Sequence, residues 1–318
     1  MFRFRRLRQS EAIRSLVRES HLSPQDLILP LFVEENITEP VEIPTMPGVL
    51  RYPEPHLPDA VRHAWSKGVR AVILFGVSQQ KDECGSDTWD ANGLMARMIR
   101  SAKQAQPEML VISDNCFCEY TSHGHCGVVE GDDVDNDLTL ENLVKQAVVA
   151  AEAGVDMIAP SGMMDGMVSA IRSGLDKAGF TNLPIMSYST KFASAFYGPF
   201  RDAVDSSFKG SRSTYQMDFA NGREAVAESV RDEIEGADIL MVKPGIAYLD
   251  ILYRVREATQ RPLAVYQVSG EYAMIKASAA AGVIDEKDLV LESLTAFKRA
   301  GADLIITYYA EDVCDWLR

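Results

Sequence analysis

Short apolar runs alternate with amphipathic segments along most of the chain. The apolar runs are rich in Val, Ile and Leu and nearly continuous, which is typical of strands buried on both faces of a sheet. We predict eight such strands, at residues 26–33, 69–77, 109–115, 155–160, 183–190, 238–243, 263–269 and 303–309. Between them, apolar positions recur at helical spacing, which predicts helices at residues 93–106, 139–153, 166–178, 222–235, 248–259 and 285–300.

A repeated motif marks the points where helices end and strands begin. Residues 153–158, 235–240 and 300–305 have the sequences AGVDMI, EGADIL and AGADLI. The glycine suits the left-handed residue that ends a helix, and the apolar run after it predicts a buried strand. Eight strands alternating with helices favour an α/β fold of the TIM (β/α)8-barrel type. An open doubly wound sheet is the alternative.

Two segments lack this alternation. Residues 34–58 contain six prolines and predict an irregular cover over the barrel. Residues 191–221 contain glycines and several aromatic side chains, and a loop of this length in a compact domain is typical of a lid. No GxGxxG motif follows the first strand and no GxxxxGK[ST] motif occurs, so the sequence does not support nucleotide binding.

The composition excludes several classes of protein. Of the 318 residues, 47% are hydrophobic and 25% are charged, as in an ordinary soluble globular protein. No apolar run approaches the roughly 18 residues of a membrane span, and the first residues lack the apolar core of a secretory signal. A transit peptide is a weaker alternative, because Glu11 and Glu19 break its acid-poor pattern. Five cysteines, an odd number, indicate a reducing compartment, and we expect a cytoplasmic protein.

The charge is distributed unevenly. A formal net charge of −14 argues against a nucleic acid or an anionic membrane as the partner. Residues 1–20 depart from this, with six arginines against two glutamates. This basic segment could dock on the acidic body of a neighbouring subunit, or it could form a solvated terminal helix. Charge alone leaves both interpretations open.

Polar side chains occur where the predicted strands end, and active-site residues of a barrel lie at these ends. They are Asp114, Cys116, Ser161, Lys191, Lys243, Ser269 and Tyr308. Lys191 and Lys243 end consecutive apolar strands, where a buried lysine is costly. A lysine in an apolar pocket beside another cation has a lowered pKa, and its neutral amine can form a Schiff base with a ketone. The alternative is an ammonium in water at the barrel rim. This alternative accounts for one such lysine more readily than for two.

A second group lies in the segment DNCFCEYTSHGHCG, residues 114–127. Cys116, Cys118 and Cys126 place three soft thiolates on one loop, a donor set that suits zinc. Three ligands leave a coordination position open, as in catalytic zinc sites. The alternative is three buried free cysteines, and to that class we assign Cys84 and Cys314. His123 and His125 lie between the thiolates. Either could be a ligand, but the short spacing favours a role in shaping the loop or in bonding to the ligands.

Further residues predict two anion sites. Arg201 and Arg212, with Lys209, can clamp a carboxylate through bidentate hydrogen bonds, although a solvated basic face is the more common arrangement. Ser269 and Tyr308 can bind a second carboxylate through their hydroxyls. The residues therefore predict an enzyme that activates a ketone as a Schiff base, uses zinc and binds two acidic groups.

The sequence closely resembles the porphobilinogen synthase (5-aminolevulinate dehydratase) family. The matching segments cover essentially the whole chain: RRLRQSEAIRSLVRES, DLILPLFV, DNCFCEYTSHGHCG, APSGMMDG, IMSYSTKFASAFYGPFRDA, MVKPGIAYLDIL, YQVSGEYAMIKA and KRAGADLIITYYA. The resemblance implies condensation of two 5-aminolevulinate molecules to porphobilinogen with release of two waters, a step of tetrapyrrole (heme) biosynthesis. It also implies a TIM barrel over residues 26–318 and an N-terminal arm, residues 1–25, that contacts a neighbour in a homo-octamer. Neither nucleic acid nor membrane is an expected partner.

The resemblance also implies roles for the acid and the amines. Lys243 matches the lysine that forms a Schiff base with the substrate supplying the propionate side of the product. Lys191 matches its partner, which binds the second substrate covalently or moves protons. Asp114 has the position of an acid/base or orienting carboxylate.

The carboxylate sites are assigned in the same way. Arg201 and Arg212, with Lys209 as a helper, match the site for the acetate-side substrate. Ser269 and Tyr308 match the site for the propionate-side substrate.

Two metal sites are implied. Cys116, Cys118 and Cys126 match the zinc-type loop of the family, in which other members carry aspartates and do without catalytic zinc. Glu228 matches a position at which bacterial-type members bind an allosteric magnesium between subunits.

The sequence departs from the family pattern at two places. Gly162 replaces an aspartate found in many members, so we assign no acid/base role there. Residues 210–213, GSRS, keep one basic residue of a GDR[KR] pattern and lose its neighbour. Neither departure affects the lysines or the cysteine loop.

Two rival functions make different predictions. A zinc-independent Schiff-base aldolase on the same barrel would keep its activity under chelation. A zinc-storage protein would bind metal without covalent trapping of a ketone, and it would need neither the lysine pair nor the two arginines.

Overall fold

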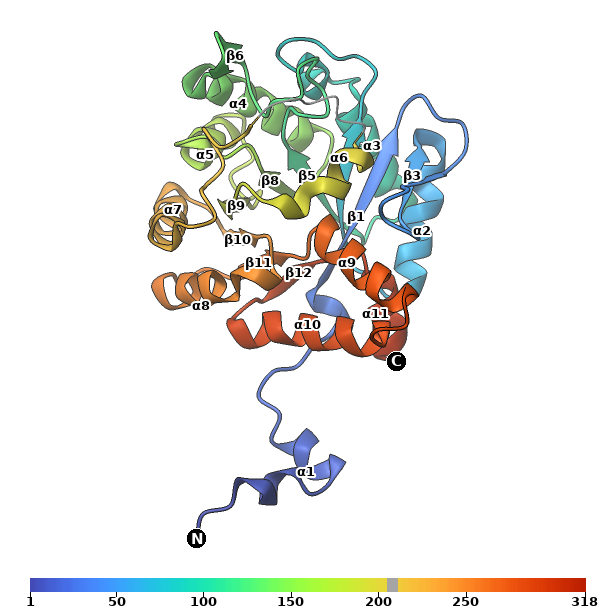
Figure 1. The fold of residues 1–318 in the computed structure, drawn as a ribbon. Helices are drawn as coiled ribbons and strands as arrows, with labels where there is room; N and C mark the ends of the chain where they lie inside the picture. The colour runs from blue at the N-terminus through green and yellow to red at the C-terminus, as the bar shows by residue number, and fades with distance from the viewer. Residues whose placement is uncertain (205–210) are drawn as a thin grey trace.

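Eight parallel strands form the centre of the computed structural model, which describes residues 1–204 and 211–318 (Figure 1). Their hydrogen-bonded order is β8–β5–β4–β1–β12–β11–β10–β9, and a parallel bridge between Ile158 and Ile185 closes the ring. The strands are β1 (Leu27–Glu34), β4 (Ala71–Val77), β5 (Leu110–Asn115), β8 (Met157–Pro160), β9 (Met186–Lys191), β10 (Ile239–Lys243), β11 (Leu263–Tyr266) and β12 (Leu304–Ile306). The predicted TIM barrel is confirmed.

Helices surround this ring, as Figure 1 shows. The longer helices between successive barrel strands are α2 (Leu57–Lys67), α3 (Leu94–Ala105), α4 (Asn136–Glu152), α5 (Met167–Lys177), α7 (Gly222–Glu235), α8 (Leu249–Ala258), α9 (Ser269–Ala280) and α10 (Glu286–Ala300). The last helix is α11 (Ala310–Trp316). As the repeated motif predicts, Gly236 and Gly301 end α7 and α10 with φ of 106° and 112°, a backbone conformation that glycine adopts without strain.

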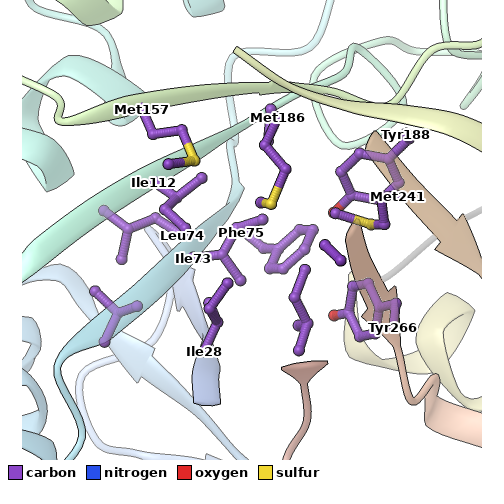
Figure 2. Close-up of a cluster of buried hydrophobic side chains, with 14 of the residues drawn as sticks. Ile28, Ile73, Leu74, Phe75, Ile112, Met157, Met186, Tyr188, Met241 and Tyr266 are labelled. Carbon is purple, nitrogen blue, oxygen red and sulfur yellow. The ribbon is translucent and has the colours of Figure 1, made fainter. Parts of the chain in front are cut away.

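The centre of the barrel is filled by apolar side chains. Each strand contributes residues at alternate positions, because successive side chains of a strand point to opposite faces. Figure 2 shows the cluster, in which seven buried members come from six strands: Ile28, Ile73, Phe75, Ile112, Met157, Met186 and Met241. The barrel is therefore a packed core, and a cavity can form only at one of its ends.

Two strands are shorter than predicted at their carboxyl ends. β11 ends at Tyr266 instead of residue 269, and Ser269 is the first residue of α9. The buried Glu271 explains this turn, because its carboxylate accepts a hydrogen bond from the backbone N–H of Val268 at 2.6 Å. β12 ends at Ile306 instead of residue 309.

The segments without periodicity contain short elements. Within residues 34–58, β2 (Val41–Glu42) pairs with β3 (Leu50–Pro53), which also pairs with β1. The predicted lid contains a short 3-10 helix, Ala195–Tyr197, and α6 (Gly198–Ala203). A two-stranded ribbon of β6 (Val129–Glu130) and β7 (Asp133–Val134) follows the cysteine loop.

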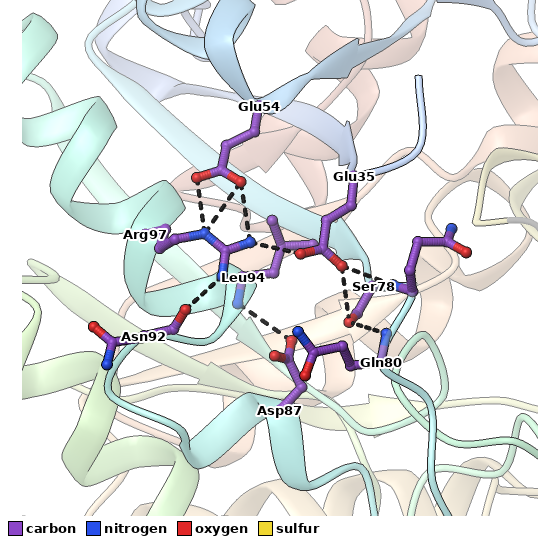
Figure 3. Close-up of polar contacts among 9 residues, drawn as sticks. Glu35, Glu54, Ser78, Gln80, Asp87, Asn92, Leu94 and Arg97 are labelled. Atoms are coloured by element: carbon purple, nitrogen blue, oxygen red, sulfur yellow. Dashed lines mark hydrogen bonds and ion pairs between the residues drawn. The ribbon is translucent and has the colours of Figure 1, made fainter. Parts of the chain in front are cut away.

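Arg97 on α3 fastens the loops that follow β1 and β3, as Figure 3 shows. Its guanidinium donates to Glu54 at 2.9 Å and to Glu35 at 2.6 Å. Glu35 also accepts a hydrogen bond from the backbone N–H of Gln79, which follows β4. This network ties three loops at one end of the barrel to a single helix.

Within residues 1–25, the first part extends away from the barrel (Figure 1), whereas Leu22 packs partly buried against the core. The first part contains a 3-10 helix, Phe4–Arg8, and α1 (Glu11–Leu16), and neither buries a residue. Phe2, Phe4 and Leu16 are 82%, 71% and 85% exposed. Among the described helices, none combines the length and the apolar character that a membrane span requires.

Candidate active site

A cavity opens at the carboxyl ends of the barrel strands. The cavity has a volume of about 170 Å³, counted as the space open to the centre of a water molecule. Its lining includes most of the predicted site residues: Asp114, Cys118, Ser161, Lys191, Arg201, Arg212, Lys243, Ser269 and Tyr308. The fold thus brings together residues spread over nearly two hundred positions of sequence.

Lys191 and Lys243 are neighbours at the base of this cavity. They end β9 and β10, and the two strands pair with these residues directly opposite each other. Both side chains are buried, with 6% of each residue exposed. The predicted juxtaposition of two lysines at strand ends is therefore what the structure shows.

The Lys243 amine lies among aromatic rings. Its Nζ is 4.4 Å from the ring centre of Tyr266, 5.0 Å from that of Tyr188 and 5.3 Å from that of Phe200. Burial, with a smaller contribution from the Lys191 charge, lowers the pKa of Lys243 to about 7. At neutral pH much of this amine is unprotonated, as a nucleophile requires.

Lys191 has different surroundings and a different proton affinity. Its Nζ donates to the carbonyl oxygen of Ser161 at 2.6 Å. Burial lowers its pKa, but the charges of the cysteine thiolates and Asp114 outweigh burial and raise the pKa above its usual value. Lys191 is therefore an ammonium that can donate a proton.

Asp114 is the penultimate residue of β5 and lines the same cavity. It is buried, and Ser161 Oγ donates to its Oδ2 at 3.1 Å. Burial raises its pKa, while the neighbouring Lys191 and Lys243 oppose the shift. The carboxyl group lies where it can exchange a proton with groups in the cavity.

The thiols of Cys116, Cys118 and Cys126 converge at the cavity wall. All three are buried, their Sγ atoms lie within 4.8 Å of one another, and the first two are 3.3 Å apart. Tetrahedral zinc with 2.3 Å bonds needs thiolates about 3.8 Å apart, so the donor set fits such an ion. Hydrogen bonds from Cys116 and Cys118 hold the pKa of Cys126 well below its usual range, which favours a thiolate there. Hydrogen bonding to Cys126 and burial raise the pKa of the other two thiols. The cluster can hold a metal ion.

Glu119 is a cavity residue that the sequence did not single out. It is buried, its Oε1 has no hydrogen-bond partner among the described residues, and burial raises its pKa to about 7. Its position between Cys118 and Tyr120, in a loop with three buried thiols, was the available signal. An acidic residue there is unusual unless a proton or a cation uses it.

The predicted carboxylate clamps both line the cavity, and they come from different elements. Ser269 and Tyr308 are buried in its wall, and the Tyr308 hydroxyl is 3.1 Å from that of Tyr266. Arg201 and Arg212 line it from the lid segments. Lys209 lies outside the described residues.

The lid residues that follow the undescribed segment contact the cysteine loop. Arg212 donates to the carbonyl oxygen of Gly124 at 2.8 Å. His125 Nδ1 is 3.1 Å from the hydroxyl of Tyr215, and His123 Nε2 is 3.0 Å from the carbonyl oxygen of Glu83. Both histidines therefore make the loop contacts that the sequence predicts.

Three other predicted residues lie away from this cavity. Glu228 lines a separate pocket on α7 with Asp165, Asp232 and Glu235, and burial and these acidic neighbours raise its pKa to about 7. Cys314 is buried on α11, as expected of an inert cysteine. Cys84 is only half-buried, because it follows a surface turn in which Asp82 accepts its backbone N–H.

A (β/α)8 barrel with a neutral amine, an ammonium and a thiol cluster in one cavity defines an enzyme with a lysine-dependent site. The family model described as "Delta-aminolevulinic acid dehydratase" matches residues 1–316. The chain belongs to the delta-aminolevulinic acid dehydratase family, a family of hydro-lyases.

Individual relatives agree with the family match. The delta-aminolevulinic acid dehydratase of Escherichia coli (strain K12) is 59% identical over 311 residues, which cover 98% of this chain and 96% of the relative. The delta-aminolevulinic acid dehydratase of Bacillus subtilis (strain 168) is 50% identical over 316 residues, which cover 99% of this chain and 98% of the relative. A crystal structure of the Toxoplasma gondii ME49 enzyme, in complex with its reaction product porphobilinogen, superposes with a TM-score of 0.97 at 48% identity. The matched region covers 99% of this chain and 91% of the Toxoplasma gondii chain.

Proposed function

We propose that this chain condenses two molecules of 5-aminolevulinate to porphobilinogen and releases two molecules of water. The observation that carries the proposal is the pair Lys191 and Lys243, directly opposite each other and buried in one cavity. A single Schiff-base lysine would serve many aldolase-type reactions. Two adjacent amines with different proton affinities suit a reaction that joins two amino ketones.

In this proposal Lys243 is the nucleophile. Its neutral amine attacks the C4 ketone of the propionate-side substrate, and the carbinolamine loses water to give a Schiff base. The lowered pKa supplies the free amine, and the rings of Tyr188, Tyr266 and Phe200 keep water from the nitrogen.

Lys191 and Asp114 handle protons or hold the second substrate. Lys191 is an ammonium beside the Ser161 carbonyl, so it can protonate a departing hydroxyl or, once deprotonated, form a second Schiff base. Asp114 can accept a proton released when the ring forms. Placing the groups before reaction lowers the entropic barrier, an effect worth up to about 10 kcal/mol in well-oriented systems.

The two substrate carboxylates bind to different elements of the cavity lining. Ser269 and Tyr308 offer hydroxyl donors to the propionate-side substrate. Arg201 and Arg212, with Lys209, offer guanidinium and ammonium donors to the acetate-side substrate. Two separate anion sites hold the two substrates in one relative orientation, which an asymmetric condensation requires.

Zinc is the metal that we assign to Cys116, Cys118 and Cys126, because three thiolates are a soft donor set. When bound there, zinc supplies Lewis-acid polarisation of the second substrate's ketone or holds its amine. A reducing compartment such as the cytoplasm would keep the three thiols available.

Magnesium and a homo-octamer complete the proposal. The acidic pocket at Glu228 offers hard oxygen donors, which magnesium prefers. Residues 1–25 are the arm that contacts a neighbouring subunit, and residues 26–318 form the catalytic barrel. The exposed apolar residues of the arm and its projection from the barrel support this division.

The test is to incubate the purified protein with 5-aminolevulinate and to follow pyrrole formation with an acidic aldehyde reagent. We expect a pyrrole that disappears on chelation and returns with zinc. Pyrrole that survives chelation would keep the reaction and remove zinc from it. No pyrrole under any metal condition would overturn the proposed function.

Two variants assign the nucleophile. Lys243→Ala should abolish pyrrole formation while the circular-dichroism spectrum stays native. Lys177→Ala, which removes an exposed lysine from α5, is the matched control and should retain full activity. A folded and active Lys243→Ala protein would contradict the assignment.

A further inference from the structure

The strand β9 contains one residue more than its neighbour β10 over the same length. Ile239 and Leu240 pair with Met186 and Ser187, but Val242 and Lys243 pair with Thr190 and Lys191. Three steps along β9 therefore match two steps along β10, which is a β-bulge.

This bulge decides which way Lys191 faces. Side chains alternate between the two faces of a strand, so a residue five positions after the inward-facing Met186 would point outward. The extra residue reverses the alternation and turns Lys191 inward, beside Lys243. Without the bulge, Lys191 would face the surrounding helices.

Polar side chains of α7 hold the outer face of the bulge. Asp232 Oδ2 accepts a hydrogen bond from Ser187 Oγ at 2.6 Å. Thr190 Oγ1 donates to the carbonyl oxygen of Ala225 at 3.2 Å and lies 2.8 Å from Ser229 Oγ. Asp232 also has a side-chain hydrogen bond with Ser189, so contacts from α7 reach the bulge itself and the residues on both sides of it.

A role in packing does not by itself explain the carboxylate of Asp232. It is 8% exposed in the layer between the barrel and α7, where apolar side chains usually pack, and it makes no ion pair among the described residues. Burial raises its pKa to about 6. An apolar residue at this position would avoid the cost of burying a carboxylate.

We propose that Asp232 is a positioning residue for Lys191, because its hydrogen bond to Ser187 fixes the bulge that turns Lys191 into the active-site cavity. This inference rests on the proposed function of Lys191. Asp232 touches neither the substrate cavity nor either lysine, so it acts through the backbone of β9. Ser229 supports the other end of the bulge at Thr190.

The test compares Asp232→Ala and Asp232→Asn with wild type in two assays. The first is steady-state pyrrole formation from 5-aminolevulinate. The second is borohydride trapping of the Schiff base on Lys243, read by peptide mass spectrometry. We expect Asp232→Ala to lower turnover about a hundredfold, as a displacement of about 1 Å can do. Trapping on Lys243 should stay close to wild type.

The conservative variant separates positioning from bulk. Asp232→Asn keeps an oxygen that can accept the Ser187 hydroxyl, so it should recover most of the turnover. Ser187→Ala removes only the hydroxyl and should show the same turnover defect. This variant provides the test if Asp232→Ala fails to fold. Glu233→Ala is the matched control, because Glu233 is acidic, lies on the same helix and binds the backbone N–H of Gln260 instead of β9.

Several outcomes would overturn the inference. One is unchanged turnover in Asp232→Ala. Another is parallel loss of turnover, Lys243 trapping and thermal stability without rescue by Asn, which indicates a general packing role. Because Asp232 also lines the pocket of Glu228, recovery of Asp232→Ala by excess magnesium alone would point to a metal ligand instead. Failure of the wild type to form pyrrole or a Lys243 adduct would count against the proposed function itself.

Discussion

At the scale of single residues, two lysines at the same level of the barrel receive opposite proton affinities from their neighbours. Aromatic rings surround the Lys243 amine and lower the stability of its charge. Thiols and a carboxylate surround Lys191 and stabilise its charge. The cavity therefore holds one neutral amine and one ammonium at the same pH, and each is suited to a different part of a condensation.

This difference predicts how Schiff-base formation on Lys243 depends on pH. The pKa of Lys243 in the folded chain, about 7, is lowered, so its neutral fraction rises through that pH. The fraction increases from about one tenth at pH 6 to about nine tenths at pH 8. We expect the rate of borohydride trapping on Lys243 to follow this rise, as measured by mass spectrometry of the adduct peptide.

Trapping isolates Lys243 better than turnover does, because Lys191 and Asp114 also titrate in the cavity. Exposed lysines, with pKa values near 10.4, provide an internal control when reductive methylation is measured in the same samples. A rate on Lys243 that rises only above pH 9 would contradict the lowered pKa.

Individual site residues differ in how far the sequence could predict them. Lys191 and Lys243 are costly to bury, and the three cysteines occur together within one short loop, so their chemistry is visible in the sequence. Asp232 lies in an ordinary amphipathic helix rich in acidic residues, and only the structure shows that it faces the barrel.

At the scale of secondary-structure elements, α4 and α5 pack closely because of one small residue. A Cβ atom at Gly174 of α5 would lie 2.4 Å from Cγ1 of Val144 on α4. Alanine stabilises an exposed helix by about 1 kcal/mol relative to glycine. Here the contact reverses the effect, since neither helix can move without disturbing the strands beneath.

We expect Gly174→Ala to lower the free energy of unfolding by about 1–3 kcal/mol, the usual cost of overpacking. Chemical denaturation measures it. Gly198→Ala is the control, because a Cβ at Gly198 in α6 would meet nothing within 4 Å and should leave stability equal or higher. A Gly174→Ala protein as stable as wild type would show that the helices separate freely.

The elements themselves were largely predictable, and their ends were less so. Buried apolar runs determined the eight strands, and glycines such as Gly236 and Gly301 determined where helices end. The end of β11 at Tyr266 depends on the Glu271 side chain, which no local pattern indicates. The bulge in β9 was not predictable, because every residue of that strand is buried and the alternation is hidden.

At the scale of the whole molecule, the basic arm and the acidic body are separate structures. Phe2, Phe4 and Leu16 are exposed in or beside two short helices that bury none of their own residues. Apolar side chains on a projecting arm are typical of a surface that another subunit covers.

Deletion of residues 1–20 should therefore reduce the proposed octamer to a smaller form. Light scattering coupled to size-exclusion chromatography measures the mass. The melting temperature of the barrel controls for misfolding. An octamer that persists without the arm, or a wild-type chain that is monomeric at high concentration, would contradict the role of the arm.

The closure of the barrel divides the chain into two halves. β9 meets β8 through the single bridge from Ile158 to Ile185, and the exposed loop at residues 178–182 lies just before that junction. A break in this loop would give one fragment with the three clustered thiols and a second fragment with both amines. Neither fragment could carry out the reaction alone, so recovery of activity on mixing would report their reassociation. The same junction makes the chain a candidate for a split reporter, in which catalysis requires that two fused partners come together.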